Sequence, residues 1–203
     1  MFEGKRILIG VCIPTDYRMD SRIKDILAYW ESSANVEIFN AIGDLPVLGR
    51  DKIAQYAQYR IPKPTNVLFL DADVLPRRKT IARLLDADKD IMMGVYPMLQ
   101  NGKLSWSVSR SPTFIPETEL PRNPFKITSG GFGVTLVKTH VLERLQWPYW
   151  KNVFEPGALT MSEDIYFCEK AREAGFDIWC DPKVKCDHIR ITSLLQLIKE
   201  HKQ

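Results

Sequence analysis

The fold is decided by one stretch of the sequence, Asn66-Val67-Leu68-Phe69-Leu70-Asp71-Ala72-Asp73. An unbroken apolar run of this kind is typical of a strand that is buried on both faces of a parallel sheet. The run ends abruptly in two aspartates, and their i, i+2 spacing places both side chains on the same side of an extended chain. In an open α/β sheet, ligands bind beyond the carboxyl ends of the strands. The sequence therefore predicts an α/β domain with a ligand site at Asp71 and Asp73.

The flanking sequence alternates between strand and helix patterns, which predicts a central, mostly parallel sheet flanked by helices. The proline-rich stretch 96–126 is expected to be mostly loop, with at most one short hairpin. No internal repeat or interdomain linker is visible, so residues 1–203 are predicted to form a single domain. We expect further strands over 6–13, 36–40, 90–95 and 176–180, and one that ends at Val137. One helix is expected to be capped by Asp20 or Ser21 and another by Ser162. The other helices are expected to begin near Asp51, at Pro76, at about Thr139 and at Thr192.

Composition excludes several classes of protein. Hydrophobic residues make up 45% and charged residues 26% of the chain, which excludes a wholly disordered or collagen-like protein. The net charge of +3 is too small for the concentrated basic face of a nucleic-acid-binding protein. No apolar run approaches the roughly 18 residues that cross a bilayer, and no signal-peptide cleavage site is visible. Four cysteines are sparse for a chain of this length, so we expect no disulfide framework and a cytoplasmic protein. They include no C-x2-C pair, so we expect no structural zinc site.

Asp71 and Asp73 are candidate metal ligands. Two adjacent carboxylates repel each other unless a cation or a proton relieves the repulsion. Oxygen ligands suit Mg²⁺ or Mn²⁺ together with phosphate oxygens. The two aspartates could share one cation, or they could divide a metal ion and a sugar hydroxyl between them. The other explanation is a solvated turn, because D-x-D is common by chance, but the fully apolar strand before it favours a functional pair.

A second candidate group follows at Ser162-Glu163-Asp164. Two acids in the first turn of a helix complement its dipole, which is a sufficient structural reason for their presence. A carboxylate in this position is also held ionised, which is the state that a general base requires. His188, taken alone, is better explained by a buried structural role than by metal binding.

Several motifs follow one another along nearly the whole chain: Ile13-Pro14-Thr15, Gly49-Arg50-Asp51-x-x-Ala54, Phe69-Leu70-Asp71-Ala72-Asp73, Gly130-Gly131-Phe132-Gly133, Ser162-Glu163-Asp164-x-x-Phe167-Cys168, Ala174-Gly175-Phe176-x-Ile178-Trp179-x-Asp181-Pro182 and His188. A lone D-x-D motif is weak, but the ordered set is specific. Their order resembles that of the GT-A fold glycosyltransferases, in particular glycosyltransferase family 2 and its small single-domain relatives.

This resemblance implies a role for each matching residue. Asp164 would be the catalytic base, and the metal ion, Mn²⁺ or Mg²⁺, would be held by Asp73 and His188 with help from Asp71. Gly130 and Gly131 would let the acceptor approach the backbone, and Glu163 would bind acceptor hydroxyls. The donor would be bound by Ile13, Pro14, Thr15, Arg50, Asp71, Ala72 and Asp73.

The implied reaction moves a sugar from a nucleoside-diphosphate sugar, with uridine or guanosine as the nucleoside, to a hydroxyl of a carbohydrate or other acceptor. A divalent ion would neutralise the leaving diphosphate, and a base on the opposite face of the sugar would give inversion of configuration.

Two other functions compete with this one. A sugar-phosphate nucleotidyltransferase would carry a glycine-rich phosphate loop after the first strand, but no glycine lies between Gly10 and Gly43. A non-catalytic nucleotide- or sugar-binding module would have no use for acids at Asp71, Asp73 and Asp164 together.

Overall fold

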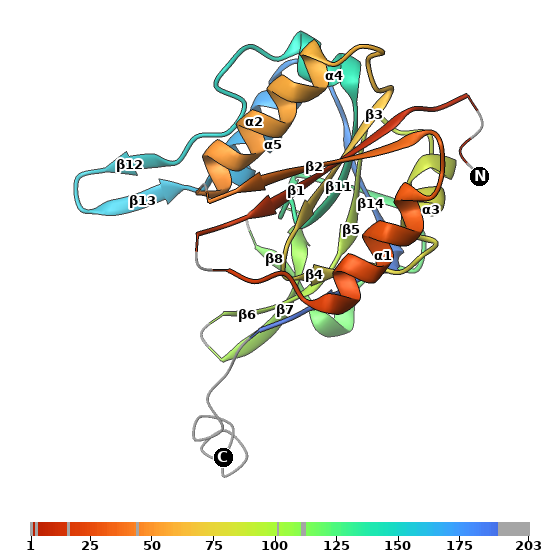
Figure 1. Ribbon diagram of the computed structural model, residues 1–203. Helices are drawn as coiled ribbons and strands as arrows, with labels where there is room; N and C mark the ends of the chain where they lie inside the picture. Colours follow the sequence, from red (N-terminus) through yellow and green to blue (C-terminus); the bar gives the residue numbers. More distant parts are fainter. Residues whose placement is uncertain are drawn as a thin grey trace.

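The computed structural model describes residues 2, 4–15, 17–43, 45–100, 102–110 and 113–190. Its centre is a seven-stranded sheet whose strands cross the middle of the molecule (Figure 1). In spatial order the strands are β2 (Val36–Ile42), β1 (Ile7–Ile13), β3 (Asn66–Asp71), β11 (Val134–Lys138), β5 (Ile91–Val95), β14 (Ile178–Lys185) and β9 (Phe125–Ile127).

The sheet is mixed, so the prediction of a mostly parallel sheet is wrong. Three of its pairings are parallel (β1 with β2, β1 with β3, and β5 with β14), and three are antiparallel (β11 with β3, β11 with β5, and β9 with β14). The main cause is β11, which lies between β3 and β5 and runs against both. A strand buried on both faces has the same apolar pattern in either direction, so its sequence does not reveal its orientation.

Helices cover both faces of the sheet. On one face, α1 (Ser21–Glu31) and α3 (Thr80–Asp86) pack into one apolar cluster with the sheet. On the other, α2 (Pro46–Tyr59), α4 (Thr139–Arg144) and α5 (Glu163–Glu173) pack into a second cluster (Figure 1). Within the described residues, no helix combines the length and apolar character that a membrane crossing demands.

Several element boundaries differ from the predicted ones. The Asp20 side chain caps α1 as expected, by accepting a hydrogen bond of 2.9 Å from the Arg22 N–H. By contrast, α2 begins at Pro46, well before Asp51, because proline suits the first turn of a helix. In the other direction, α3 begins only at Thr80, after Pro76. The helix predicted from Thr192 lies outside the described residues.

The stretch 96–126 is not mostly loop, as predicted, but forms a second sheet. In it β7 (Lys103–Ser109) lies between β6 (Pro97–Gln100) and β10 (Ser129–Gly130). Strand β7 also pairs with β8 (Phe114–Pro116), and the short helix η1 (Glu117–Glu119) follows β8. Pro97 and Pro116 stand at strand ends, where the missing N–H costs no interior ladder bond. The prolines therefore mark the ends of short strands.

Two small ribbons complete the fold. A hairpin of β12 (Val153–Glu155) and β13 (Ala158–Met161) projects from the body of the molecule just before α5 (Figure 1). A two-stranded ribbon pairs β4 (Val74–Leu75) with β15 (Asp187–His188) and brings the last described strand back to the end of β3.

Candidate active site

The candidate site lies at the carboxyl end of β3, in the turn that contains Asp71 and Asp73. Backbone hydrogen bonds hold this turn on both sides. The Asp71 N–H donates to the Gly133 carbonyl at 3.1 Å, and the Ala72 N–H donates to the Cys12 carbonyl at 3.2 Å. The neighbouring strands β1 and β11 therefore fix the direction in which the aspartates leave the sheet.

Arg50 gathers three acids around one buried guanidinium group. Its Nη2 donates to both carboxylate oxygens of Asp71 at 3.1 Å. Its Nη1 donates to Glu163 Oε1 at 3.0 Å and to Asp164 Oδ1 at 2.8 Å. The Arg50 side chain is 4% exposed. Helix α2 thus supplies one cation that joins the end of β3 to the first turn of α5.

The charges of this cluster shift its acid–base equilibria. Burial by itself lowers the pKa of Arg50, but the three carboxylates, with Asp164 foremost, more than offset that effect and raise it. Burial is also the main reason that the pKa of Asp71 is raised. The pKa of Asp164 rises to about 7, because burial outweighs the attraction of Arg50 and the charges of Glu163 and Asp71 add to the rise. Asp164 therefore titrates in the range that suits a general base.

The second oxygen of Asp164 faces the glycine-rich turn 130–133. The Phe132 N–H donates to Asp164 Oδ2 at 3.3 Å, and the Phe132 ring lies 5.8 Å from the Arg50 guanidinium carbon. A Cβ on Gly131 would lie 3.8 Å from Asp164 Oδ2, so this turn is the immediate neighbour of the acid. The motifs at 50, 71, 130–133 and 163–164 therefore meet in space, as their order in the sequence suggested.

Asp73 points away from the Arg50 cluster and faces His188. His188 Nε2 lies 3.3 Å from Asp73 Oδ2, and its Nδ1 lies 2.9 Å from the Pro97 carbonyl oxygen. A carbonyl can only accept, so Nδ1 carries the hydrogen and Nε2 is the nitrogen turned to the carboxylate. The hydrogen bond to Asp73 is the main reason that the pKa of His188 is raised. The two aspartates therefore have different protein partners, Arg50 for Asp71 and His188 for Asp73.

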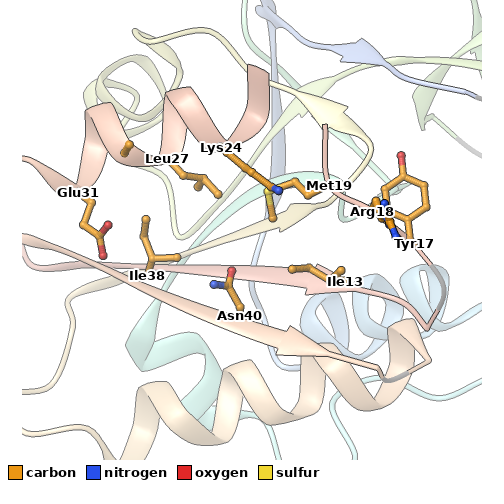
Figure 2. A pocket seen from close by; sticks show the side chains of 10 residues that line it. Ile13, Tyr17, Arg18, Met19, Lys24, Leu27, Glu31, Ile38 and Asn40 are labelled. Atoms are coloured by element: carbon orange, nitrogen blue, oxygen red, sulfur yellow. The ribbon is translucent and has the colours of Figure 1, made fainter. Parts of the chain in front are cut away.

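Five of the seven residues predicted to bind the donor line one of two hollows, and the other two, Thr15 and Arg50, line neither. Tyr17 lines both a cavity of about 130 Å³ at the aspartates and a larger groove of about 530 Å³ between α1 and β2. Figure 2 shows the groove with Lys24, Leu27 and Glu31 of α1 on one side and Ile38 and Asn40 of β2 on the other. Thr15 donates to the Gly43 carbonyl at 2.8 Å and so joins the ends of β1 and β2. The cavity is lined by Cys12, Pro14, Tyr17, Pro46, Asp71, Ala72 and Asp73, and Ile13 lines the groove.

Sequence reasoning missed Tyr96, which contacts both parts of the site. Its ring meets His188 edge-on, and its hydroxyl accepts from the Gly133 N–H at 3.4 Å. The rule that ligands bind at the carboxyl ends of strands would have pointed to it, because Tyr96 follows β5 directly. Sequence reasoning also missed Asn152, whose Oδ1 accepts a hydrogen bond from the Glu163 N–H at 2.9 Å.

The fold is a glycosyltransferase-like α/β fold, by its similarity to two solved structures. A solved structure of A197 from STIV superposes with a TM-score of 0.66 and 18% identity, over 92% of this chain and 86% of that one. A crystal structure of GalNAc-T7 with UDP, GalNAc and Mn²⁺ superposes with a TM-score of 0.56 and 12% identity, over 93% of this chain and 44% of that one. This chain thus spans less than half of GalNAc-T7. No family model and no curated protein matches the sequence. At these identities the likeness establishes the fold alone.

Proposed function

We propose that this protein is a metal-dependent glycosyltransferase that moves a sugar from a nucleoside-diphosphate sugar to a hydroxyl acceptor with inversion of configuration. The observation that carries the proposal is the Arg50 cluster, which joins Asp164, with its pKa of about 7, to Asp71 at the end of β3. Two residues further along the chain, Asp73 faces His188, and these two side chains form a pair of metal-ligating type. The crystal structure of GalNAc-T7, which contains UDP, GalNAc and Mn²⁺, supports this choice among the activities that an α/β fold can host.

Asp73 and His188 fit a divalent cation. Nδ1 of His188 is committed to the Pro97 carbonyl, and Nε2 is hydrogen-bonded to the Asp73 carboxylate. A divalent cation would take the place of the proton between Nε2 and the carboxylate. The residues that the structure describes contain no group of three or more metal-ligating side chains, so phosphate oxygens and water would complete the coordination. When bound, the ion supplies neutralisation of the negative charge that develops on the leaving diphosphate.

Asp164 acts as the general base. As the acceptor oxygen bonds to the anomeric carbon, the bond from that carbon to the diphosphate oxygen breaks and its electron pair leaves with the diphosphate. The proton of the acceptor hydroxyl passes to the carboxylate of Asp164. Attack from the face opposite the leaving group inverts the anomeric configuration.

Arg50 and Glu163 prepare the base for this step. Arg50 holds Asp164 through a bond of 2.8 Å and keeps a fraction of it ionised near neutral pH, against the burial that favours protonation. Glu163 shares the same nitrogen of Arg50 and leaves its second oxygen for acceptor hydroxyls. Gly131 borders the acceptor beside them, whereas Gly130 is buried and the space that its missing Cβ leaves is filled by Met93 and Val108 rather than by an acceptor.

The donor occupies the hollows at the ends of β1, β2 and β3. Its diphosphate lies in the cavity at Asp71, Ala72 and Asp73, and its nucleoside, uridine or guanosine, lies beyond Pro14 and Thr15 toward Tyr17. Ile13 completes the donor site from the end of β1, whereas Arg50, whose Nη atoms donate to Asp71, Glu163 and Asp164, acts on the donor through Asp71.

A two-stage experiment tests the function. Thermal unfolding is first measured with UDP, GDP and their sugar conjugates, each in Mn²⁺ and in EDTA. A ligand at about 100 times its dissociation constant adds about 2.7 kcal/mol of stability. The donor that stabilises in Mn²⁺ is then incubated with a mixture of carbohydrate acceptors, and released nucleoside diphosphate and glycosylated product are measured together. Equal stabilisation in Mn²⁺ and EDTA contradicts the metal dependence, and binding without release contradicts the catalytic function.

A further inference from the structure

Tyr96 is held rigidly between the two parts of the candidate site. It follows the last residue of β5 and is 5% exposed. Its N–H donates to Ser107 Oγ at 3.2 Å, and its carbonyl accepts the Ser107 N–H at 3.0 Å. The backbone of Tyr96 is therefore fixed to β7, and its side chain has a defined direction.

The Tyr96 ring packs against His188. The two ring centroids are 5.1 Å apart and the planes meet at 76°, which is an edge-to-face contact. The imidazole thus has three neighbours that fix its orientation: the Asp73 carboxylate, the Pro97 carbonyl and the tyrosine ring. Loss of the ring would remove one of these three restraints and leave His188 held only by Asp73 and the Pro97 carbonyl.

The Tyr96 hydroxyl fills a space that only glycine leaves open. A Cβ on Gly131 would lie 2.1 Å from Tyr96 Oη and 3.1 Å from Cζ. The hydroxyl also accepts the Gly133 N–H at 3.4 Å. Between these two glycines stands Phe132, whose N–H donates to Asp164. The hydroxyl therefore supports the turn that orients the proposed base.

We propose that Tyr96 is a positioning residue that sets the geometry of His188 and of Asp164 at the same time. This inference rests on the proposed function, because positioning has meaning only for a reaction at these residues. The ring acts on His188, and hence on the donor with its metal ion. The hydroxyl acts through the 131–133 turn on Asp164, and hence on the transfer step.

The two contacts are separated by two substitutions. Tyr96→Phe keeps the ring and removes the hydroxyl, so we expect kcat to fall about tenfold, the effect of one lost hydrogen bond, while the donor KM stays within about twofold. Tyr96→Leu also removes the ring, so we expect Mn²⁺-dependent donor affinity to fall as well. A residue with only a structural role would not divide its effects between kcat and donor binding in this way.

A double substitution tests the contact with Gly131 directly. Gly131→Ala forces a methyl group against Tyr96 Oη, and Tyr96→Phe removes that oxygen. We expect the double variant to be more active and to unfold at a higher temperature than Gly131→Ala alone. Gly133→Ala is the matched control, because its Cβ would lie 2.7 Å from Tyr96 Cε1 and 2.7 Å from Val74 Cγ2, which Tyr96→Phe leaves in place.

Three results would overturn the inference. The first is a wild-type kcat in Tyr96→Phe, and the second is an equal loss of kcat and donor affinity in that variant. The third is a double variant, Gly131→Ala with Tyr96→Phe, that is as impaired as Gly131→Ala alone. A wild-type protein that binds donor but transfers no sugar contradicts the proposed function instead, and this is seen before any variant is compared. In that case the coupling between Tyr96 and Gly131 is measured from the unfolding temperatures of the wild type, Tyr96→Phe, Gly131→Ala and the double variant. Additive losses in these unfolding temperatures overturn the inference.

Discussion

At the scale of single residues, burial controls the chemistry of Asp164. A carboxyl in water has a pKa of about 3.9, and burial moves that of Asp164 to about 7. We expect sugar transfer to rise with pH through about 7, because only the ionised form accepts the proton. Asp164→Asn should keep donor binding, lose this pH dependence and transfer sugar roughly 10² to 10⁴ times more slowly. Near-normal turnover in this variant would move the role of base to another residue.

The same shift makes stability depend on pH. Because the folded-state pKa is raised, this group's contribution to stability is complete below the unfolded pKa of about 4 and is lost as pH rises through about 7. Denaturant titrations of the wild type and Asp164→Asn between pH 4 and 8 measure this difference. An identical pH dependence in the two proteins would contradict the raised pKa.

Arg50 offers a second test at this scale. Removing one partner from a buried ionic cluster leaves uncompensated charge, which costs roughly 3 to 5 kcal/mol. We expect Arg50→Met to lose this much unfolding free energy at neutral pH and less at low pH, where the carboxylates are protonated. Arg60→Met is the matched control, because Arg60 pairs with Glu37 at the surface, where both side chains are about two-fifths exposed, and we expect little change. If Arg50→Met lost as little unfolding free energy as Arg60→Met, the Arg50 cluster would contribute little to stability.

At the scale of elements, the ribbon of β4 and β15 decides where His188 lies. The pairing of His188 with Val74 places the imidazole beside Asp73, two residues after the end of β3. We expect His188→Ala and Asp73→Ala each to weaken Mn²⁺-dependent nucleoside-diphosphate binding about tenfold or more, with Mn²⁺ preferred to Mg²⁺ because of the nitrogen ligand. His140→Ala is the control, since this half-exposed histidine pairs with Asp90 away from the site. Calorimetric affinity that is unchanged in His188→Ala would make this histidine a structural residue.

The residue just before the β12–β13 hairpin, Asn152, caps the first turn of helix α5. Ser162 stands at the N-cap position, as predicted, but within the described residues its side chain makes no capping hydrogen bond. Asn152 takes that role by accepting the Glu163 N–H at 2.9 Å. We expect Asn152→Ala to cost about 1 kcal/mol of stability and to lower acceptor affinity, because Glu163 is then less well held. Ser162→Ala should do neither, and a larger loss from Ser162→Ala than from Asn152→Ala would contradict this assignment.

At the scale of the whole molecule, local patterns predicted six of the seven strands of the central sheet and most helices, but not the second sheet and not how the elements meet. The apolar run 66–70 and the Asp20 cap are local signals, and both elements occur as predicted. The direction of β11 is not encoded in its own residues, since its orientation depends on β3 and β5. Likewise, the contact of Arg50 with Asp164 joins residues 114 positions apart. The resemblance brought the site residues together in the prediction, but only the fold reveals that Arg50 and Tyr96 connect them.

The site also joins the two halves of the core. Trp30 is buried in the apolar cluster under α1 and α3, and Trp150 is buried in the cluster under α2, α4 and α5. Asp71 lies between these clusters at the end of β3, and Arg50 and Asp164 approach it from helices on the second face. A ligand that contacts these residues should therefore stabilise both clusters together.

This arrangement predicts that the chain unfolds as one cooperative unit. In protein labelled with fluorotryptophan, we expect the ¹⁹F signals of Trp30 and Trp150, assigned with Trp→Phe variants, to disappear at the same temperature. Mn²⁺ with the matching nucleoside diphosphate at about 100 times its dissociation constant should shift both signals upward by the same amount, roughly 5 to 10 °C for a chain of this size. Two separate transitions, or a shift confined to one tryptophan, would mean that the two faces of the sheet fold independently and that the ligand stabilises only one of them.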